Sequence, residues 1–298
     1  MDDVERLSFR ETKVKIGIIG QGFVGTAIRE GLKNFFPVLV YDIKEELCPK
    51  EFLATTPNII QKCEIIFQCL PTPMKKTGEC DLSIVINSLK ILDTISEVHK
   101  KKPIVVIKST VPPGTCEELD SKFKNINIVF NPEFLTEANS IDDFKNQTRI
   151  ILGGKRPHTT VLKTVYRKAF PQIPIVKTGF KTAEMTKYFI NNFLATKVSF
   201  ANEVYEICSK LGIDYDKVVE YALYDQRIGK SHLSVPGPDG DFGYGGHCFP
   251  KDLDAMIFIC IKNHIDCAML NTTREKNDKI RKNRDWENMS GRAISYEE

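Results

Sequence analysis

The chain has 298 residues, of which 42% are hydrophobic and 27% are charged, and its formal net charge is only +3. This size suits one large or two ordinary globular domains, and the small net charge gives no reason to expect a nucleic-acid or membrane surface. The first residues alternate acidic and basic side chains, and no apolar run is long enough to span a bilayer, so we expect a cytoplasmic protein. The nine cysteines include no CxxC pair, which favours reduced thiols over a disulfide framework or a zinc site.

Seven short runs rich in β-branched residues recur through residues 1–180, and segments of helical character separate most of them. Several runs are almost continuously apolar, which is typical of strands that are covered on both faces. The alternation predicts an α/β fold with a doubly wound, Rossmann-like parallel sheet. The runs are VKIGII, PVLVYD, EIIFQCL, PIVVIKS, INIVF, RIILGG and IPIVKTG.

A glycine-rich turn follows the first run. Gly20, Gly22 and Gly25 form a GxGxxG pattern between an apolar strand and a helix, and Asp42 ends the next strand. In a Rossmann fold the first glycine allows a tight turn, the second lets the backbone approach a pyrophosphate, and the third lets the helix pack on the strand. Asp42 can accept the ribose hydroxyls of adenosine and would repel a 2′-phosphate. The pattern predicts an NAD site in preference to a turn kept only for packing.

A long helix is predicted from Thr182 to Leu211. This segment has no proline or glycine, Thr182 can cap its amino end, and Gly212 can end it. At 1.5 Å per residue the helix would be roughly 44 Å long, more than a small domain needs for its own core. Its apolar positions are not confined to one narrow stripe, so we expect it to connect two domains and to form the interface of a homodimer.

Shorter helices are expected at 214–226, 252–265 and 268–282, which completes a mainly helical domain over residues 181–282. A glycine-rich loop lies between the first two of these helices and contains Cys248. The final stretch, residues 283–298, is polar, and we expect a loosely held tail.

Cys248 lies in surroundings that suit nucleophilic chemistry. The amino end of the following helix and the nearby Lys251 would favour its thiolate, which attacks carbonyl carbon. Next to a hydride acceptor, a thiolate supports aldehyde oxidation through a thiohemiacetal and a thioester. The alternative is a small buried residue in a loop whose glycines serve only the turn. The five histidines show no ligand spacing, so no metal site is predicted.

Several blocks together resemble one known family. GYGGHCFPKD closely resembles the cysteine motif of the nucleotide-sugar dehydrogenases, the UDP-glucose/GDP-mannose dehydrogenase family, and DQRIG resembles the segment upstream of it. CLPTP, KSTVPPGT, NPEFLTE and EMTKYFINNFLA resemble further blocks in the family's order, so the similarity runs from about residue 14 to about residue 280. Family members generally carry a third α/β domain that closes over the nucleotide. Nothing after Leu270 resembles it, so we expect a chain without that domain.

The resemblance implies roles for residues of the central part of the chain. Cys248 would hold the C6 carbon of the substrate as a thiohemiacetal and then as a thioester. Lys187 and Asn191 would steady the oxyanion that develops at C6, and their spacing of four residues puts them on one helix face. Asp252 would move protons together with Lys187 and a water molecule.

The resemblance also implies a base and a set of binding residues. Glu133 would activate the water that hydrolyses the thioester, with Thr110 and Glu137 arranging that water, and Arg227 would reach the substrate across the dimer interface. The implied NAD contacts are Gly20, Gly22, Phe23, Val24, Gly25, Asp42, Thr72, Thr110, Glu137 and Lys251. The implied substrate contacts are Glu133, Phe134, Leu135, Lys187, Asn191, Arg227, Phe242, Tyr244 and Gly245.

The function implied by the resemblance is NAD-dependent, four-electron oxidation of the C6 alcohol of a nucleotide sugar, with UDP-glucose as the first candidate. GDP-mannose and UDP-N-acetylhexosamines remain open as substrates. Two other classes also remain open: a truncated NAD-binding protein without catalytic activity, and a small 3-hydroxyacid dehydrogenase, which would use a helix lysine and would not need Cys248. No nucleic-acid or membrane partner is expected.

Overall fold

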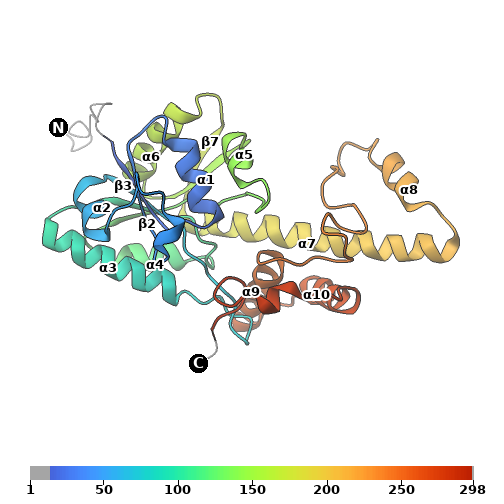
Figure 1. The fold of residues 1–298 in the computed structure, drawn as a ribbon. Helices are drawn as coiled ribbons and strands as arrows, with labels where there is room; N and C mark the ends of the chain where they lie inside the picture. The colour runs from blue at the N-terminus through green and yellow to red at the C-terminus, as the bar shows by residue number, and fades with distance from the viewer. Residues whose placement is uncertain (1–13, 297–298) are drawn as a thin grey trace. The chain divides into compact units, whose positions relative to one another are not determined.

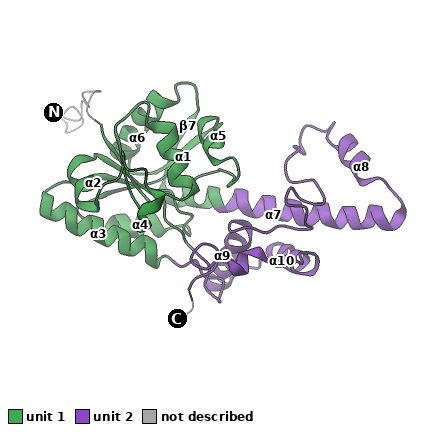
Figure 2. Cartoon of the chain, in the orientation of Figure 1, with its two compact units in different colours: residues 1–72, 82–187 green, residues 73–81, 188–298 purple. Residues whose placement is uncertain are grey.

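The computed structural model describes residues 14–296, which belong to two compact units (Figure 2). The first unit contains the chain up to Thr72 together with Leu82–Lys187. The second contains Pro73–Asp81 together with the chain from Tyr188 onward. The sequence suggested a border after residue 180, whereas the structure has the border inside a long helix and assigns one short earlier segment to the second unit.

Seven strands in the first unit form one sheet in the order β2-β1-β3-β4-β5-β6-β7 (Figure 1). All neighbouring strands are parallel except β5 and β6. Each strand lies within one of the seven predicted runs, and the Rossmann-like fold is confirmed, with the antiparallel β5–β6 pair as the difference from an all-parallel sheet. The strands are β1 (Ile16–Ile19), β2 (Val38–Tyr41), β3 (Ile65–Gln68), β4 (Ile104–Ile107), β5 (Asn127–Phe130), β6 (Ile150–Gly154) and β7 (Ile175–Thr178).

Helices cover both faces of this sheet (Figure 1). Because side chains alternate along a strand, Ile16 and Ile18 of β1 enter one apolar core while Ile19 enters the other. The first core also receives side chains from α1 (Phe23–Leu32), α5 (Ser140–Lys145) and α6 (Arg156–Ala169). The second receives side chains from α2 (Thr56–Lys62), α3 (Ser83–His99) and α4 (Thr115–Lys122).

The strand order reverses at β1, which has β2 on one side and β3 on the other. In a doubly wound sheet the two connections diverge at such a point and leave a crevice at the carboxyl ends of the strands, which is where ligands bind. The turn after β1 therefore lies at the expected ligand edge of the first unit.

The helix α7 (Phe180–Leu211) is one continuous helix of 32 residues, as predicted, and it contributes residues to both units. It begins two residues earlier than expected, because the amide of Ala183 already donates a hydrogen bond to the carbonyl of Gly179. Thr182 is thus inside the first turn and does not cap the helix. Gly212 follows with a left-handed φ of +66° and ends it as predicted.

The second unit also contains α8 (Tyr215–Ala222), α9 (Phe249–Lys262) and α10 (Ala268–Ile280). Residues 283–296 are folded, which differs from the loosely held tail that their polar composition suggested, and residues 297–298 of that expected tail lie outside the described residues. Trp286 is buried, and backbone hydrogen bonds of 2.8 Å join Met74 to both Ala293 and Ser295. Within residues 14–296, no helix combines the length and the apolar character needed to cross a membrane.

Candidate active site

The turn between β1 and α1 has the geometry that its glycines predict. Gly20 has a φ of +91°, and a Cβ at this position would overlap the carbonyl oxygen of Cys69 at the end of β3. A Cβ on Gly25 would overlap the carbonyl oxygen of Gly20. Neither position accepts a side chain, so α1 packs directly on the turn.

Gly22 differs from the other two glycines, because a Cβ there would meet no atom within 4 Å. It immediately precedes α1, where the first backbone amides lack helical partners and the helix dipole is positive. Asp42, just after β2, accepts hydrogen bonds from the amides of Gln21 at 2.6 Å and Lys44 at 2.9 Å. The open space suits a pyrophosphate and the fixed carboxylate suits a ribose, so these residues fit the adenosine half of NAD.

Glu133 lies buried just after β5, and both of its carboxylate oxygens have partners in the first unit. Oε1 accepts a hydrogen bond from Nζ of Lys187 at 3.0 Å, and Oε2 accepts one from the amide of Leu135 at 2.7 Å. Burial opposes the negative charge of Glu133, but Lys187 and these hydrogen bonds outweigh burial and lower the pKa of the carboxyl group. Glu133 is therefore ionised at neutral pH. The ring of Phe134 lies 5.4 Å from Nζ of Lys187.

Other predicted residues of the first unit surround the ends of β3 and β4. The hydroxyl of Thr72 donates a hydrogen bond of 2.8 Å to the carbonyl of Thr110, and both side chains are buried. Phe23 and Val24 are half-buried at the start of α1, whereas Glu137 is exposed. The structure thus joins Glu133 to Lys187, and Thr72 to the backbone carbonyl of Thr110.

Cys248 in the second unit is the N-cap residue of α9 and is partly exposed. Lys251 and Asp252 are buried in the first turn of this helix, with their charged groups 2.5 Å apart. Burial opposes the charge of Lys251, but the negative charge of Asp252 and its hydrogen bond outweigh burial and raise the pKa of the amine. The Lys251 amine is therefore protonated at neutral pH, three residues after Cys248 in the sequence.

Asn191 of α7 joins this group. Its Nδ2 donates a hydrogen bond of 2.6 Å to Oδ2 of Asp252, and Nδ2 of Asn192 donates to the backbone carbonyl of Asp252 at 3.4 Å. The second unit therefore brings together four residues that the sequence assigned to chemistry or binding: Asn191, Cys248, Lys251 and Asp252.

The glycine-rich loop before Cys248 is held by polar side chains that the sequence reasoning missed. Asn277 accepts a hydrogen bond from the amide of Tyr244 at 2.8 Å and donates one to its carbonyl at 3.0 Å. Asp285 accepts from the amide of Gly246 at 3.1 Å. A Cβ on Gly245 would overlap the side-chain ends of Asp285 and Arg281, both of which would have to shift. In the sequence, the sign of this role was Asn277 itself, a buried and uncharged residue among the charged side chains of α10.

Two predicted substrate contacts lie on the surface of the second unit. Phe242 is half-exposed, with its ring 5.6 Å from that of Tyr205. The Arg227 side chain is almost fully exposed and pairs with Asp225 at 2.5 Å. The expected contact of Arg227 across a dimer interface stays a prediction.

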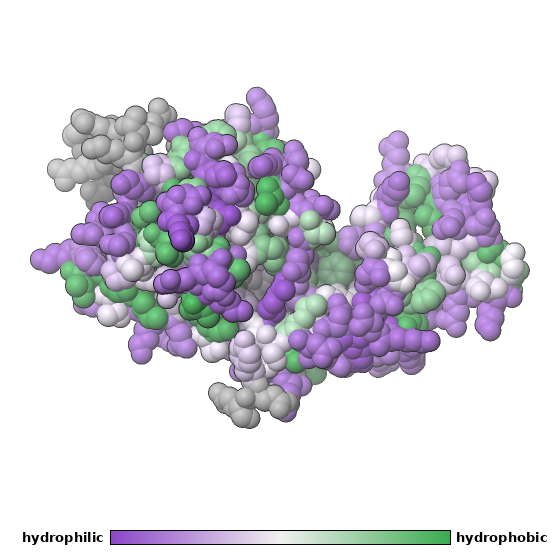
Figure 3. Space-filling view, in the orientation of Figure 1, coloured by the Kyte–Doolittle hydropathy of each residue, from purple (hydrophilic) through white to green (hydrophobic). Residues whose placement is uncertain are grey.

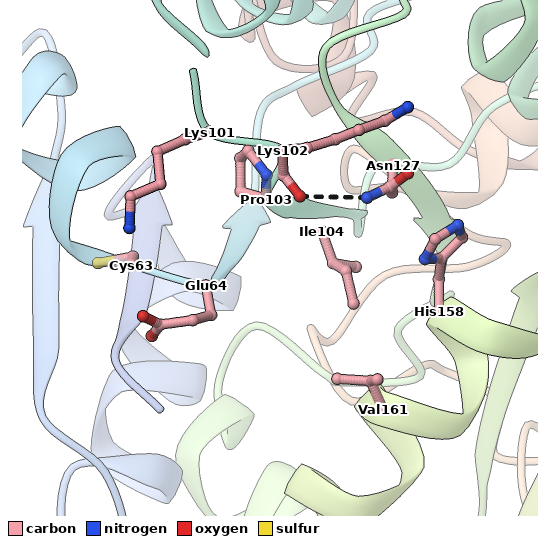
Figure 4. A pocket seen from close by; sticks show the side chains of 9 residues that line it. All are labelled: Cys63, Glu64, Lys101, Lys102, Pro103, Ile104, Asn127, His158 and Val161. Atoms are coloured by element: carbon pink, nitrogen blue, oxygen red, sulfur yellow. Dashed lines mark hydrogen bonds between the residues drawn. The ribbon is translucent and has the colours of Figure 1, made fainter. Parts of the chain in front are cut away.

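A pocket of about 260 Å³ lies at the opposite edge of the sheet, before β3, β4 and β5 (Figure 4). Cys63, Lys102 and His158 are among its lining residues, and Nδ2 of Asn127 donates a hydrogen bond of 3.1 Å to the carbonyl of Lys102. Since the NAD-binding turn and Glu133 follow the carboxyl ends of strands, this pocket is not part of the candidate active site. No group of His, Cys, Asp and Glu suited to a metal ion occurs among residues 14–296.

Comparison with known proteins matches two successive parts of the chain to two domains of one family. Residues 37–170 match the NAD binding domain of the UDP-glucose/GDP-mannose dehydrogenase family, and residues 181–279 match the central domain of the same family. The first unit is accordingly the NAD-binding part of the chain.

Individual relatives carry related names. The chain is 38% identical to a UDP-glucose 6-dehydrogenase of Rickettsia felis over 226 residues, which cover 74% of this chain and 49% of that protein. It is 31% identical to the UDP-glucose 6-dehydrogenase TuaD of Bacillus subtilis over 301 residues, which cover 90% of this chain and 63% of TuaD. The structure of a UDP-glucose dehydrogenase from Pyrobaculum islandicum matches with a TM-score of 0.81 at 26% identity, over 91% of this chain and 69% of that one.

The chain spans about half the length of the Rickettsia relative. The two domain matches together nevertheless cover most of the residues of this chain. The chain therefore belongs to the UDP-glucose/GDP-mannose dehydrogenase family.

Proposed function

We propose that the chain is an NAD-dependent dehydrogenase that oxidises the C6 alcohol of UDP-glucose to a carboxylate. Membership of the family supports oxidation of a nucleotide sugar, and the names of the relatives favour UDP-glucose over GDP-mannose and UDP-N-acetylhexosamines. The observation that carries the proposal is a partly exposed thiol, Cys248, beside the buried pair of Lys251 and Asp252. A fixed cation and a helix amino end both favour negative charge on that sulfur.

The first oxidation converts the alcohol to an aldehyde. Bound NAD supplies the hydride acceptor, and the hydroxyl proton leaves through Asp252 and water. Lys187 and Asn191 stabilise negative charge on the C6 oxygen, since an ammonium has three donors and a primary amide has two. Lys187 donates one hydrogen bond to Glu133, and Asn191 donates one to Asp252, so each donor side chain is also held by a carboxylate.

The second oxidation passes through sulfur. The Cys248 thiolate adds to the aldehyde carbon and forms a thiohemiacetal. A second NAD would accept the hydride from that carbon while the hydroxyl proton leaves to water, which gives a thioester. Water then attacks the thioester carbon while Glu133 accepts its proton, the carbon–sulfur bond breaks, and the sulfur leaves as a thiolate. The products are a carboxylate, two reduced cofactors and the free enzyme.

The test is to supply the full chain with UDP-glucose and NAD and to count NADH per sugar. Two NADH per UDP-glucose are expected. Cys248→Ser is expected to bind NAD like the parent chain but to fail to complete the four-electron oxidation, whereas Cys267→Ser, at another partly buried thiol, keeps full turnover. Absence of turnover with every nucleotide sugar contradicts the proposal, and NAD binding without sugar-nucleotide binding would indicate a non-catalytic NAD-binding protein.

We also propose that the chain forms a homodimer through α7. Five large apolar side chains of the second unit are exposed along this helix, at spacings of four and seven residues that place them on one stripe. They are Phe189, Phe193, Phe200, Ile207 and Leu211. The surface seen in Figure 3 is largely hydrophilic, and a row of exposed aromatic and aliphatic residues on one helix is typical of an interface.

The compartment is proposed from the cysteines. All nine are free thiols in the structure. Free thiols in this number suit the reducing conditions of the cytoplasm.

A further inference from the structure

Lys108 is a buried lysine to which the proposed reaction assigns no role. It directly follows β4 in the KSTVPPGT block, and its amide donates a hydrogen bond of 3.0 Å to the carbonyl of Gln68 at the end of β3. The residue is only 5% exposed. A lysine enclosed in this way loses most of its hydration, so its retention requires specific partners.

The partners of Lys108 form a polar network inside the first unit. Its Nζ donates to Oδ1 of Asn131 at 3.0 Å and to the carbonyl of Pro132 at 3.4 Å. The hydroxyl of Tyr166 donates to the same Oδ1 at 2.5 Å, and Nδ2 of Asn131 donates to the carbonyl of Ile151 at 2.8 Å. The amide of Asn131 is therefore fixed with its oxygen toward the lysine, and neither acceptor of the ammonium is a carboxylate.

Two charged residues, Glu133 and Lys187, influence the pKa of Lys108. Burial lowers the pKa of Lys108 to about 8, opposed in part by Cys69 and Glu133 and assisted by Lys187. Burial also raises the pKa of the Cys69 thiol to about 12 and raises the pKa of Tyr166, so both of these groups are neutral near pH 8. The charge of Lys108 in turn helps to lower the pKa of Glu133.

We propose that Lys108 is a positioning residue for Glu133: its ammonium, held by Asn131 and by the carbonyl of Pro132 directly before Glu133, sets how strongly that carboxylate can act as a base. When Lys108 is protonated, Glu133 has two cations near it and is a weaker base. When Lys108 loses its proton, Lys187 alone remains and Glu133 becomes a stronger base. This inference rests on the proposed role of Glu133 in hydrolysis.

The first test needs no enzyme activity. NMR titration of the full chain with carbon-13 at the lysine Cε and glutamate Cδ positions is expected to show one lysine that ionises near pH 8 and is lost in Lys108→Met. Glu133→Gln is expected to lower the pKa of this lysine, because an opposite charge is removed. Tyr166→Phe is expected to raise the same pKa, because Asn131 Oδ1 loses a competing donor. In Lys108→Met the pKa of Glu133 should rise by about one unit, because a nearby positive charge is removed.

The second test follows thioester hydrolysis against pH. We expect the parent chain to gain rate through an ionisation near pH 8, and Lys108→Met to lack that ionisation while Lys102→Met, at an exposed lysine before β4, retains it. If no lysine ionises below pH 9.5, or if Lys108→Met leaves the ionisation of Glu133 unchanged, the inference is wrong even in an active enzyme. If the NMR shifts occur in a chain that does not oxidise any sugar nucleotide, the coupling stands and the proposed function fails.

Discussion

At the scale of single residues, the structure places four of the predicted site residues in two buried ion pairs. Glu133 with Lys187 and Asp252 with Lys251 are each enclosed by protein, at 3.0 Å and 2.5 Å. Removing one member of such a pair leaves an uncompensated charge, so isosteric neutral variants are the informative ones.

Glu133→Gln is expected to slow hydrolysis of the thioester by about a hundredfold or more, because an amide cannot accept the proton of the attacking water. The acyl group should then accumulate on Cys248, where intact-protein mass spectrometry detects it after a burst of NADH. Glu117→Gln, at an exposed glutamate that pairs with Lys181 on the surface, serves as the control and should show no adduct. An unchanged hydrolysis rate in Glu133→Gln would assign the base elsewhere.

Lys108 makes stability depend on pH in a defined direction. Its pKa is lowered to about 8 by burial, so the unfolded chain binds more protons than the folded chain between pH 8 and the ordinary lysine value. Stability therefore rises with pH across this window, by about 3 kcal/mol for this group. Urea unfolding at several pH values should show that the rise shrinks in Lys108→Met and persists in Lys102→Met. Equal pH dependence in both variants would mean that Lys108 titrates normally.

At the scale of elements, neighbouring glycines of the NAD-binding turn are expected to have different roles, one in folding and one in NAD binding. In Gly25→Ala the new methyl overlaps the carbonyl of Gly20, so a loss of roughly 1–3 kcal/mol of stability is expected. In Gly22→Ala the methyl enters open space, so stability should change by less than about 0.5 kcal/mol. That methyl would occupy the space for the pyrophosphate, and calorimetric titration should show NAD binding weakened at least tenfold. Normal NAD affinity in Gly22→Ala would place the pyrophosphate elsewhere.

The exposed stripe of α7 makes a second prediction at this scale. Phe200 lies in the middle of the stripe and is 65% exposed. Phe200→Glu is expected to convert a dimer to a monomer in sedimentation experiments, since a carboxylate at an interface core must be desolvated. Ile91→Glu, at an exposed apolar residue of α3, should leave the dimer intact. A parent chain that is monomeric at high concentration contradicts the proposed interface.

At the scale of the whole molecule, the features that could be predicted are those written in local patterns. Short runs rich in β-branched residues mark all seven strands, and the absence of proline and glycine marks α7. The direction of β6 could not be predicted, because a buried strand has the same apolar pattern whether its neighbour is parallel or antiparallel.

The residues of the candidate site could likewise be predicted from the sequence only where a local pattern marks them. Gly20, Gly25 and Asp42 follow from backbone geometry and a short motif, whereas the pairing of Glu133 with Lys187 joins two segments with no shared local pattern. Only the family resemblance selected those residues. Lys108 was missed because a residue at the end of an apolar strand is ordinarily interpreted as part of the packing of that strand. Nothing in the local sequence indicates that its amine faces Asn131.

The assignment of Pro73–Asp81 to the second unit connects the order of synthesis to the order of assembly. This segment is made early, yet the backbone groups that bind Met74 belong to Ala293 and Ser295, which are made only after all residues of the first unit. The second unit thus stays incomplete until Ala293 and Ser295 have been made, and a nascent chain carries residues 73–81 without these partners after the first unit has been synthesised.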